Sequence, residues 1–416
     1  MTIAEKILAR ASGAKTVKPR QIVTAKIDIA MSHENADVVL RAFREIGVEK
    51  VWDRERIVLL FDHRIPAESE KTSATHQRIR EFVREQGIKY FYDMKEGICH
   101  QILPENGHSI PGEVMVGTDS HTTTHGAFGT FATGIGATEM AGVWATGELW
   151  FVVPASMRIK VTGKFQKCVS AKDLILSIIS RLGSAGADYR AVEFCGETIS
   201  EMSIASRMVL TNLSMEMGAK VAFVVPDEKV RAYVNGRTGK EFTAFLPDDD
   251  AEYAEDMEIN VDDLESMIAC PHTVDNVKPV RALADKRIDQ ALIGSCTNGR
   301  LEDLAVAAGI LQGKQVASHV RLLVIPASRR VYLEAIQQGY IKIFLEAGAL
   351  ILNPGCGPCL GAHQGLMAPG EVCISTTNRN FKGRMGSSES FVYLASPATV
   401  AQSAISGEIS SPQDHI

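Results

Sequence analysis

The sequence predicts an α/β fold in which mostly parallel sheets are layered with helices. Short runs rich in β-branched and other apolar residues alternate with longer stretches of helical periodicity, and this alternation is typical of parallel sheets. Polar residues follow several of the strand-like runs directly, as expected where ligands gather at the carboxyl ends of parallel strands. The 416 residues are enough for roughly two to four domains with sizeable cores.

Local patterns place the elements along the chain. The predicted strands are IVLLFD (57–62), VMVGTD (114–119), MRIKVTG (157–163), ALIGS (291–295), VRLLVIPA (320–327) and ALILNPG (349–355). The predicted helices are 34–46, 72–86, 129–148, 171–182, 203–218, 300–312 and 328–338. The segment 129–148 is rich in Gly, Ala and Thr, so we predict one tightly packed helix there. Its GIGATE lacks the third glycine of a dinucleotide-binding fingerprint, which disfavours a nucleotide site.

Composition and charge narrow the functional class. The formal net charge is -6 and no basic block stands out, so no nucleic-acid partner is expected. No apolar run approaches the length that spans a bilayer, and the first ten residues resemble the start of an amphipathic helix rather than a secretion signal. We therefore expect a cytoplasmic protein without membrane contact.

The eight cysteines are too few for a disulfide framework in a chain of this length. Cys356 and Cys359 lie in the loop sequence NPGCGPC, and Cys296 lies in IGSCTNGR, 60 residues earlier. A structural zinc ion would need a fourth ligand, and a redox dithiol would not need the third cysteine. An iron–sulfur cluster on three thiolates would leave one iron open as a Lewis acid. We expect the other five cysteines to be small buried apolar residues; they are Cys99, Cys168, Cys195, Cys270 and Cys373.

Several polar groups could carry chemistry beside such a centre. Asp62 and His63 follow a predicted strand, and a carboxylate next to a histidine can orient the ring and raise its basicity. A polar strand end without function is the simpler alternative. His121 and His125 have the spacing of a zinc-binding helix, but no glutamate lies between them. Arg379 and Arg384 could each bind a carboxylate, or could lie on a solvated loop.

Four motifs together resemble the aconitase superfamily: IGSCTNGR, NPGCGPC, GTDSHT and NRNFKGR. The stretches HTTTHGAFG and GRMGSSES…VYLASPATVAQSAI favour its isopropylmalate branch. The similarity extends from about residue 5 to residue 410. Thr124 stands where aconitases proper usually carry asparagine, and this departure also points to the isopropylmalate branch rather than to citrate.

The resemblance implies a fold, a cofactor and a partner. It implies three α/β/α domains, at 1–153, 154–278 and 279–416, around a [4Fe–4S] cluster held by Cys296, Cys356 and Cys359. The swivelling fourth domain of aconitases is not expected in this chain. In the isopropylmalate branch that domain is a separate small subunit, so we expect a heterodimer whose partner supplies the serine base.

The resemblance also assigns roles to individual residues. His63 would protonate the departing hydroxyl with Asp62 as its orienting partner. The other catalytic residues it implies are His100, Asp119, His121 and Glu216. The substrate-binding residues it implies are His33, Ser120, Asn378, Arg379 and Arg384. Asn212 and Asn298 would support the cluster.

The activity implied is that of a hydro-lyase in leucine biosynthesis, which interconverts 2- and 3-isopropylmalate by removing and re-adding water. Homoaconitate, dimethylmalate and methylmalate are alternative substrates within the same superfamily. Two functions from other classes stay open at this point: an iron–sulfur electron carrier and an RNA-binding apo-protein. The acidic net charge argues against the second.

Overall fold

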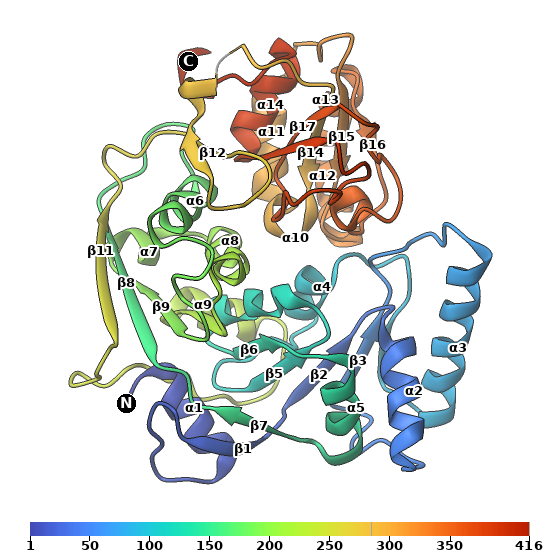
Figure 1. Ribbon diagram of the computed structural model, residues 1–416, viewed down its shortest axis with the longest axis vertical. Coiled ribbons are helices and arrows are strands. Elements are labelled where there is room, and N and C mark those ends of the chain that lie inside the picture. The colour runs from blue at the N-terminus through green and yellow to red at the C-terminus, as the bar shows by residue number, and fades with distance from the viewer. Residues whose placement is uncertain (284, 416) are drawn as a thin grey trace.

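The computed structural model describes residues 1–283 and 285–415 and contains three principal sheets, each layered with helices. The first sheet lies at the lower right of Figure 1, the second at the left and the third at the top with the C-terminus. The predicted α/β class with mostly parallel strands is therefore confirmed. None of the helices within the described residues has the length and apolarity that crossing a bilayer requires.

The first sheet is wholly parallel, in the strand order β4-β3-β2-β5-β6. Its strands are β2 (Ile29–Ser32), β3 (Ile57–Leu60), β4 (Tyr90–Tyr92), β5 (Val114–Gly117) and β6 (Phe131–Gly134). The helical elements of this region are α1 (Ile3–Ser12), α2 (Ala36–Ile46), α3 (Glu70–Gln86), α4 (Cys99–Glu105), η1 (Ser120–Phe128) and α5 (Ala137–Thr146). A separate antiparallel ribbon joins β1 (Ile22–Lys26) to β7 (Glu148–Val152).

The two faces of the first sheet bury different partners because side chains alternate along a strand. Ile57 and Leu59 of β3 join the core that contains α1, α2 and α5. Val58 and Leu60 point the other way and join a smaller core with α4, Cys296 and Cys356. The first sheet therefore packs apolar side chains against Cys296 and Cys356, two of the predicted cluster ligands.

The second sheet is also wholly parallel, in the order β10-β9-β8-β11. Its strands are β8 (Ser156–Thr162), β9 (Ala191–Cys195), β10 (Val221–Val224) and β11 (Glu255–Asn260). The helical elements are α6 (Ala171–Leu182), α7 (Glu197–Glu201), α8 (Ile204–Leu213), η2 (Ser214–Met217) and α9 (Glu228–Asn235). The short η2 continues directly from α8, so the predicted helix 203–218 changes geometry over its last turn.

The third sheet has the order β13-β12-β18-β17-β14-β15-β16, and only β12 pairs antiparallel with its neighbours. Its strands are β12 (Met267–Ala269), β13 (Val277–Pro279), β14 (Gln290–Gly294), β15 (Arg321–Ile325), β16 (Leu350–Ile351), β17 (Val372–Ser375) and β18 (Phe391–Leu394). The helical elements are η3 (Val280–Leu283), α10 (Ser295–Asn298), α11 (Leu301–Leu311), α12 (Arg329–Gln337), α13 (Tyr340–Glu346), η4 (Gly357–Leu360), α14 (Pro397–Ser406) and η5 (Pro412–His415).

Two sequence-based expectations can be compared with these elements. The single helix predicted at 129–148 is wrong, because Phe131–Gly134 forms β6 at the edge of the first sheet before α5 begins. The domain boundaries near 154 and 278 stay predictions; β12 lies before the second boundary but pairs with the third sheet.

The three layered units meet at the centre of the molecule. There α10 of the third unit contacts both α4 of the first and α8 of the second (Figure 1). Because α10 carries Cys296, the packing of all three units fixes the position of this residue.

Glu113 provides a test of this buried packing, because its Oε2 atom is buried and has no hydrogen-bond partner within the described residues. Burial raises the pKa of Glu113 to about 7. A raised carboxyl pKa means that the native state binds more protons than the unfolded state, so its contribution to stability falls as pH rises from about 4.5 to about 7. The free energy of unfolding of a Glu113→Gln variant, relative to that of the wild type, should therefore rise by about 1–3 kcal/mol between pH 5 and pH 8. Thermal unfolding of both proteins at the two pH values measures this difference. A difference independent of pH would contradict this assignment.

Candidate active site

Most predicted site residues lie just beyond the carboxyl ends of parallel strands. In the first sheet, His33 follows β2, the Asp62–His63 pair follows β3 and Asp119 follows β5. In the third sheet, Cys296 follows β14 and Asn378 follows β17. Asn212 and Glu216 come from the end of α8 and from η2 in the second unit.

One asparagine links two of the three predicted ligand cysteines. The Asn378 Nδ2 atom lies 3.4 Å from the Cys296 sulfur, while the Cys359 thiol is 3.4 Å from the Asn378 Oδ1 atom. Asn212 donates a second amide to the Cys296 sulfur at 3.3 Å. Cys356 lies three positions before Cys359 and belongs to the same apolar cluster as Cys296, so the three cysteines lie in one region of the molecule.

The donor set suits an iron–sulfur cluster. All three cysteines are free and buried. Burial raises the pKa of Cys296 to about 12 and that of Cys356 well above its ordinary value. A metal centre beside such thiols would favour the thiolate form, because its positive charge offsets the cost of burying a negative charge. Amide donors aimed at a sulfur are the hydrogen bonds that a cluster ligand accepts.

Two buried basic side chains hold the backbone around the sulfurs. The Arg300 guanidinium donates to the carbonyl oxygens of Cys296 and Thr297 at 2.7 and 2.6 Å. The Lys172 Nζ atom donates to the carbonyls of Thr376 and Thr377 at 2.9 and 2.6 Å, and the complete burial of this side chain lowers its pKa to about 7. Those two threonines directly precede Asn378, so Lys172 fixes the segment that reaches both sulfurs.

The turn into α10 explains why glycine precedes the Ser-Cys sequence. Gly294 has a φ of 147°, and a Cβ atom there would lie 2.4 Å from the carbonyl oxygen of Ile325. Only glycine fits this close approach between neighbouring strands. The turn brings Cys296 from the end of β14 toward the first sheet.

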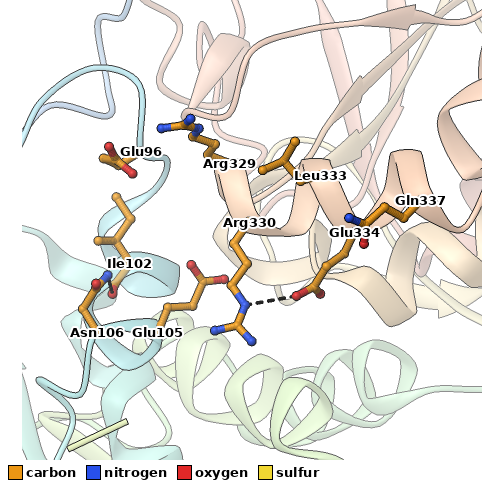
Figure 2. Close-up of a pocket in the computed structure, with 9 residues that line it drawn as sticks. All are labelled: Glu96, Ile102, Glu105, Asn106, Arg329, Arg330, Leu333, Glu334 and Gln337. Carbon is orange, nitrogen blue, oxygen red and sulfur yellow. Dashed lines mark hydrogen bonds and ion pairs between the residues drawn. The ribbon is translucent and has the colours of Figure 1, made fainter.

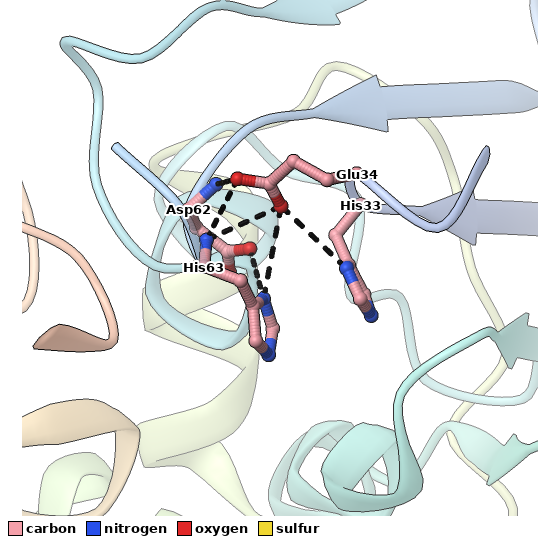
Figure 3. A group of neighbouring side chains, drawn as sticks. All are labelled: His33, Glu34, Asp62 and His63. Atoms are coloured by element: carbon pink, nitrogen blue, oxygen red, sulfur yellow. Dashed lines mark hydrogen bonds and ion pairs between the residues drawn. The ribbon is translucent and has the colours of Figure 1, made fainter. Parts of the chain in front are cut away.

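Hydrogen bonds to both the side chains and the backbone amides hold the Asp62–His63 pair in place (Figure 3). The Nδ1 atom of His63 lies 2.5 Å from an Asp62 oxygen, and the other Asp62 oxygen accepts from the Cys99 amide at 2.8 Å. The Glu34 carboxylate accepts the backbone amides of Asp62, His63 and Arg64 at 3.1, 2.9 and 2.9 Å. The ring of His33 stacks on that of His63 with centroids 4.0 Å apart.

This geometry favours a protonated His63. Burial disfavours the charged ring, but the Asp62 carboxylate raises the pKa of His63 well above its ordinary value. Burial likewise disfavours the Asp62 carboxylate, and the charge on His63 lowers its pKa to about 2. A protonated His63 whose Nδ1 atom is bonded to Asp62 can donate a proton from its Nε2 atom.

Asp119 is the meeting point of three histidines. Its oxygens lie 2.8 Å from His100 Nε2, 3.5 Å from His63 Nε2 and 3.5 Å from His121 Nδ1. These hydrogen bonds outweigh burial and keep the pKa of Asp119 well below its ordinary value. His125, weighed above as a zinc ligand, instead lies behind His100, with its Nε2 3.2 Å from His100 Nδ1.

Glu216 joins the second unit to the other two. One of its oxygens lies 2.8 Å from both His121 Nε2 and Arg379 Nε. Burial raises its pKa, but His121 and Arg379 together lower the pKa below its ordinary value. An ionised Glu216 therefore holds His121 and Arg379 in fixed orientations.

These groups border an open cavity of about 640 Å³. Its lining contains His33, His63, Asp119, Ser120, His121, Arg379 and Arg384. The buried Nε atom of Arg384 has no hydrogen-bond partner within the described residues, so this arginine is available to a ligand. Another cavity, of about 440 Å³ between α4 and α12, contains none of the predicted site residues (Figure 2). Its polar lining includes an Arg330–Glu334 ion pair at 3.0 Å.

Asn298 lies apart from the predicted arrangement. Its Nδ2 atom donates to the buried Asp303 carboxylate at 2.9 Å, and no hydrogen bond from Asn298 to a cysteine sulfur occurs within residues 1–283 and 285–415. A carboxylate is a far stronger acceptor than sulfur, so Asp303 takes the amide. The Asn298 amide therefore supports α11, and its role in supporting the cluster stays a prediction.

The sequence analysis missed three buried residues that position the site: Glu34, Lys172 and Arg300. Glu34 directly follows β2, so the strand-end pattern that selected Asp62 could have selected it too. Arg300 closes the IGSCTNGR motif. Lys172 gives no signal of this kind, because a lysine in the first turn of an amphipathic helix is usually solvated.

Comparison with known proteins decides the family. The aconitase family model, described as aconitate hydratase, matches residues 5–407. This chain belongs to the aconitase family. The family prediction is confirmed, and membership makes the chain part of a hydro-lyase and implies an iron–sulfur cluster, which the three buried cysteines can hold.

The aconitase-family relatives are similar over nearly their whole length. A probable 3-isopropylmalate dehydratase large subunit of Methanothermobacter thermautotrophicus is 56% identical, with 99% of each chain covered. A 3-isopropylmalate dehydratase large subunit of Methanopyrus kandleri is 53% identical, covering 100% of this chain and 99% of that one. A probable methanogen homoaconitase large subunit of M. thermautotrophicus is 52% identical, with 99% and 98% covered.

A solved structure supports the fold. The crystal structure of Thermococcus kodakaraensis aconitase X in its holo-form matches with a TM-score of 0.50 and 14% identity, covering 86% of this chain and 85% of that one. At this identity the match supports the fold alone.

Lys172→Met tests the role of the buried lysine. The substitution removes the Lys172 donor from the carbonyls of Thr376 and Thr377. Thr376 keeps the hydrogen bond from the Thr297 hydroxyl at 2.6 Å, while an unsatisfied Thr377 carbonyl costs about 1–3 kcal/mol. We expect a lower unfolding temperature and a lower content of iron and sulfide in the purified protein. Lys342→Met on α13, where the lysine side chain is 79% exposed, is the control and should change neither. Equal iron content and equal unfolding temperature in both variants would contradict this role.

Proposed function

We propose that this chain is the large subunit of a 3-isopropylmalate dehydratase. It would interconvert 2- and 3-isopropylmalate by dehydration and rehydration, in the cytoplasm, within leucine biosynthesis. The observation that carries the proposal is a group of three buried cysteines next to an open cavity, which is lined by the carboxylate-oriented His63 and by Arg384. The names of the most similar relatives given above support the same substrate.

The cluster proposed is a [4Fe–4S] cluster held by Cys296, Cys356 and Cys359. When bound, it would supply Lewis acidity toward the substrate hydroxyl, which is a poor leaving group without such help. Asn212 and Asn378 would donate hydrogen bonds to its ligands. The type of cluster and its ligands belong to the proposal.

His63 would be the proton donor for the departing hydroxyl. Asp62 holds the Nδ1 side of its ring, so the Nε2 atom faces the cavity near Asp119. A proton donor of this kind typically contributes about 10²–10⁴-fold to a rate. Asp119, with His100 behind it, would keep the His63 and His121 rings in position.

The substrate carboxylates would bind to the arginines. Arg384 is available in the cavity, and Arg379 is oriented by Glu216. Forked guanidinium donors suit a carboxylate on which negative charge builds as the neighbouring proton leaves. Ser120 and His33, which line the cavity, would complete the polar contacts together with Asn378, which lies at the cysteine sulfurs. The base that removes this proton would come from a serine of a separate small subunit.

A homoaconitase is the second candidate, because a large subunit of that name is 52% identical over nearly the full chain. The two substrates differ in the group next to the reacting carbons, an isopropyl group in one and a carboxylate-bearing chain in the other. An RNA-binding apo-form and an electron carrier find no support in the geometry, since neither uses a proton donor beside arginines.

Replacement of one ligand cysteine tests the cluster. We expect Cys356→Ser to lose the visible absorbance of an iron–sulfur protein and at least 99% of the dehydratase activity together, because serine replaces a thiolate ligand. Cys195→Ser on β9, outside the site, is the control and should keep both. A colourless Cys356→Ser enzyme with full activity would refute the cluster hypothesis.

A substrate panel tests the reaction and the missing base. The chain would be assayed alone and with a purified small subunit of a 3-isopropylmalate dehydratase, using 3-isopropylmalate, homoaconitate, dimethylmalate and methylmalate. We expect almost no turnover by the chain alone and the highest kcat/KM for 3-isopropylmalate in the mixture. Full turnover by the chain alone would contradict the proposal that the base is on a partner, and a preference for homoaconitate would favour the second candidate.

A further inference from the structure

An apolar surface adjoins the mouth of the proposed active site. The ribbon of β1 and β7 packs Val23, Ala25 and Phe151 against the first core. Its opposite face is open to solvent, where Ile22 is 67% exposed and Trp150 is 58% exposed. Figure 1 shows this ribbon at the lower edge of the molecule.

The register of the ribbon places these side chains together. Ile22 pairs with Val152, and Thr24 pairs with Trp150, so all four side chains project from the same face. Isolated exposed apolar residues are ordinary on a protein surface, but contiguous ones mark interaction sites.

Tyr189 connects this ribbon face to the cavity. Its phenol lies at the backbone of Val152, and the residue itself lines the 640 Å³ cavity together with Ser120 and Arg379. The Lys220 ammonium lies 5.5 Å from the Tyr189 ring centroid and 5.9 Å from that of Phe151, and Lys220 lines the same cavity. Tyr189 therefore lies between Val152 of the ribbon and the wall of the cavity. We name Ile22, Trp150, Val152 and Tyr189 the rim.

We propose that the rim is where the small subunit docks, which places the partner directly over the mouth of the cavity. This inference rests on the proposed function, because it assumes that a separate subunit completes the site. The rim meets the two requirements for such a partner. It offers apolar area for affinity, and it borders the cavity into which the partner must project its base.

The test measures binding separately from catalysis. A double variant, Ile22→Thr with Trp150→Thr, keeps β-branched residues on the strands and removes the apolar area. The matched control is Ile336→Thr with Leu345→Thr on α12 and α13, where the side chains are 52% and 57% exposed. The partner is a purified small subunit of a 3-isopropylmalate dehydratase, and the dissociation constant is measured by calorimetry.

We expect the rim variant to bind the small subunit at least tenfold more weakly and the control variant to bind as the wild type does. At saturating small subunit the rim variant should recover the wild-type kcat, because neither residue touches the substrate. An unchanged dissociation constant in the rim variant would overturn the proposal. So would a wild-type chain that does not bind the small subunit, or one that dimerises through the rim in analytical ultracentrifugation.

The two proposals fail in different ways. If the wild-type chain binds the small subunit through the rim but does not convert isopropylmalate, the docking inference stands and the proposed substrate falls. If the enzyme converts isopropylmalate and the rim variant binds normally, the function stands and the docking inference falls.

Discussion

The structure of the site depends on one constraint: a buried sulfur cannot hold its own loop in place. Thiols donate and accept only weak hydrogen bonds, so the segments that carry them must be fixed through their backbone. Arg300 and Lys172 do this with hydrogen bonds to four carbonyl oxygens. Both side chains bind the backbone rather than the sulfurs. The donors that face the sulfurs are the neutral side-chain amides of Asn212 and Asn378. These amides add no charge at the sulfurs.

The same constraint explains why the site lies between units and not within one. Carboxyl ends of parallel strands end in loops that are free to carry polar groups, but one sheet edge offers only a few of them. Here the loops at the carboxyl ends of the strands of the first and third sheets meet. Helix α8 of the second unit contacts η1 of the first unit and α10 of the third. Cys356 illustrates the junction, because its amide donates to the Asp62 carbonyl at 2.8 Å across the two sheets.

The sequence allowed the strands, most helices and the gathering of the motif residues to be predicted, because each depends on a local pattern. It failed where local and tertiary preferences conflict. The run 129–148 has the small residues of a close-packed helix, yet Phe131–Gly134 completes the edge of a sheet. Glu34 and Lys172 were missed for another reason. Their roles consist of bonds to backbone groups that are distant in sequence, by about 28 to 30 positions for Glu34 and 204 to 205 for Lys172.

Most charged groups at the cavity are paired with one another, which keeps their side chains in fixed positions before a ligand binds. Glu216 is paired with His121 and Arg379, and Asp119 with His100, so these charges compensate one another before any ligand arrives. A buried charge without such compensation is costly, which is why most of them are paired. Arg384 departs from this rule, since its buried Nε has no partner within the described residues. The cavity therefore combines a fixed framework of paired charges with the unpaired Nε atom of Arg384, an arrangement that a dicarboxylate would complete.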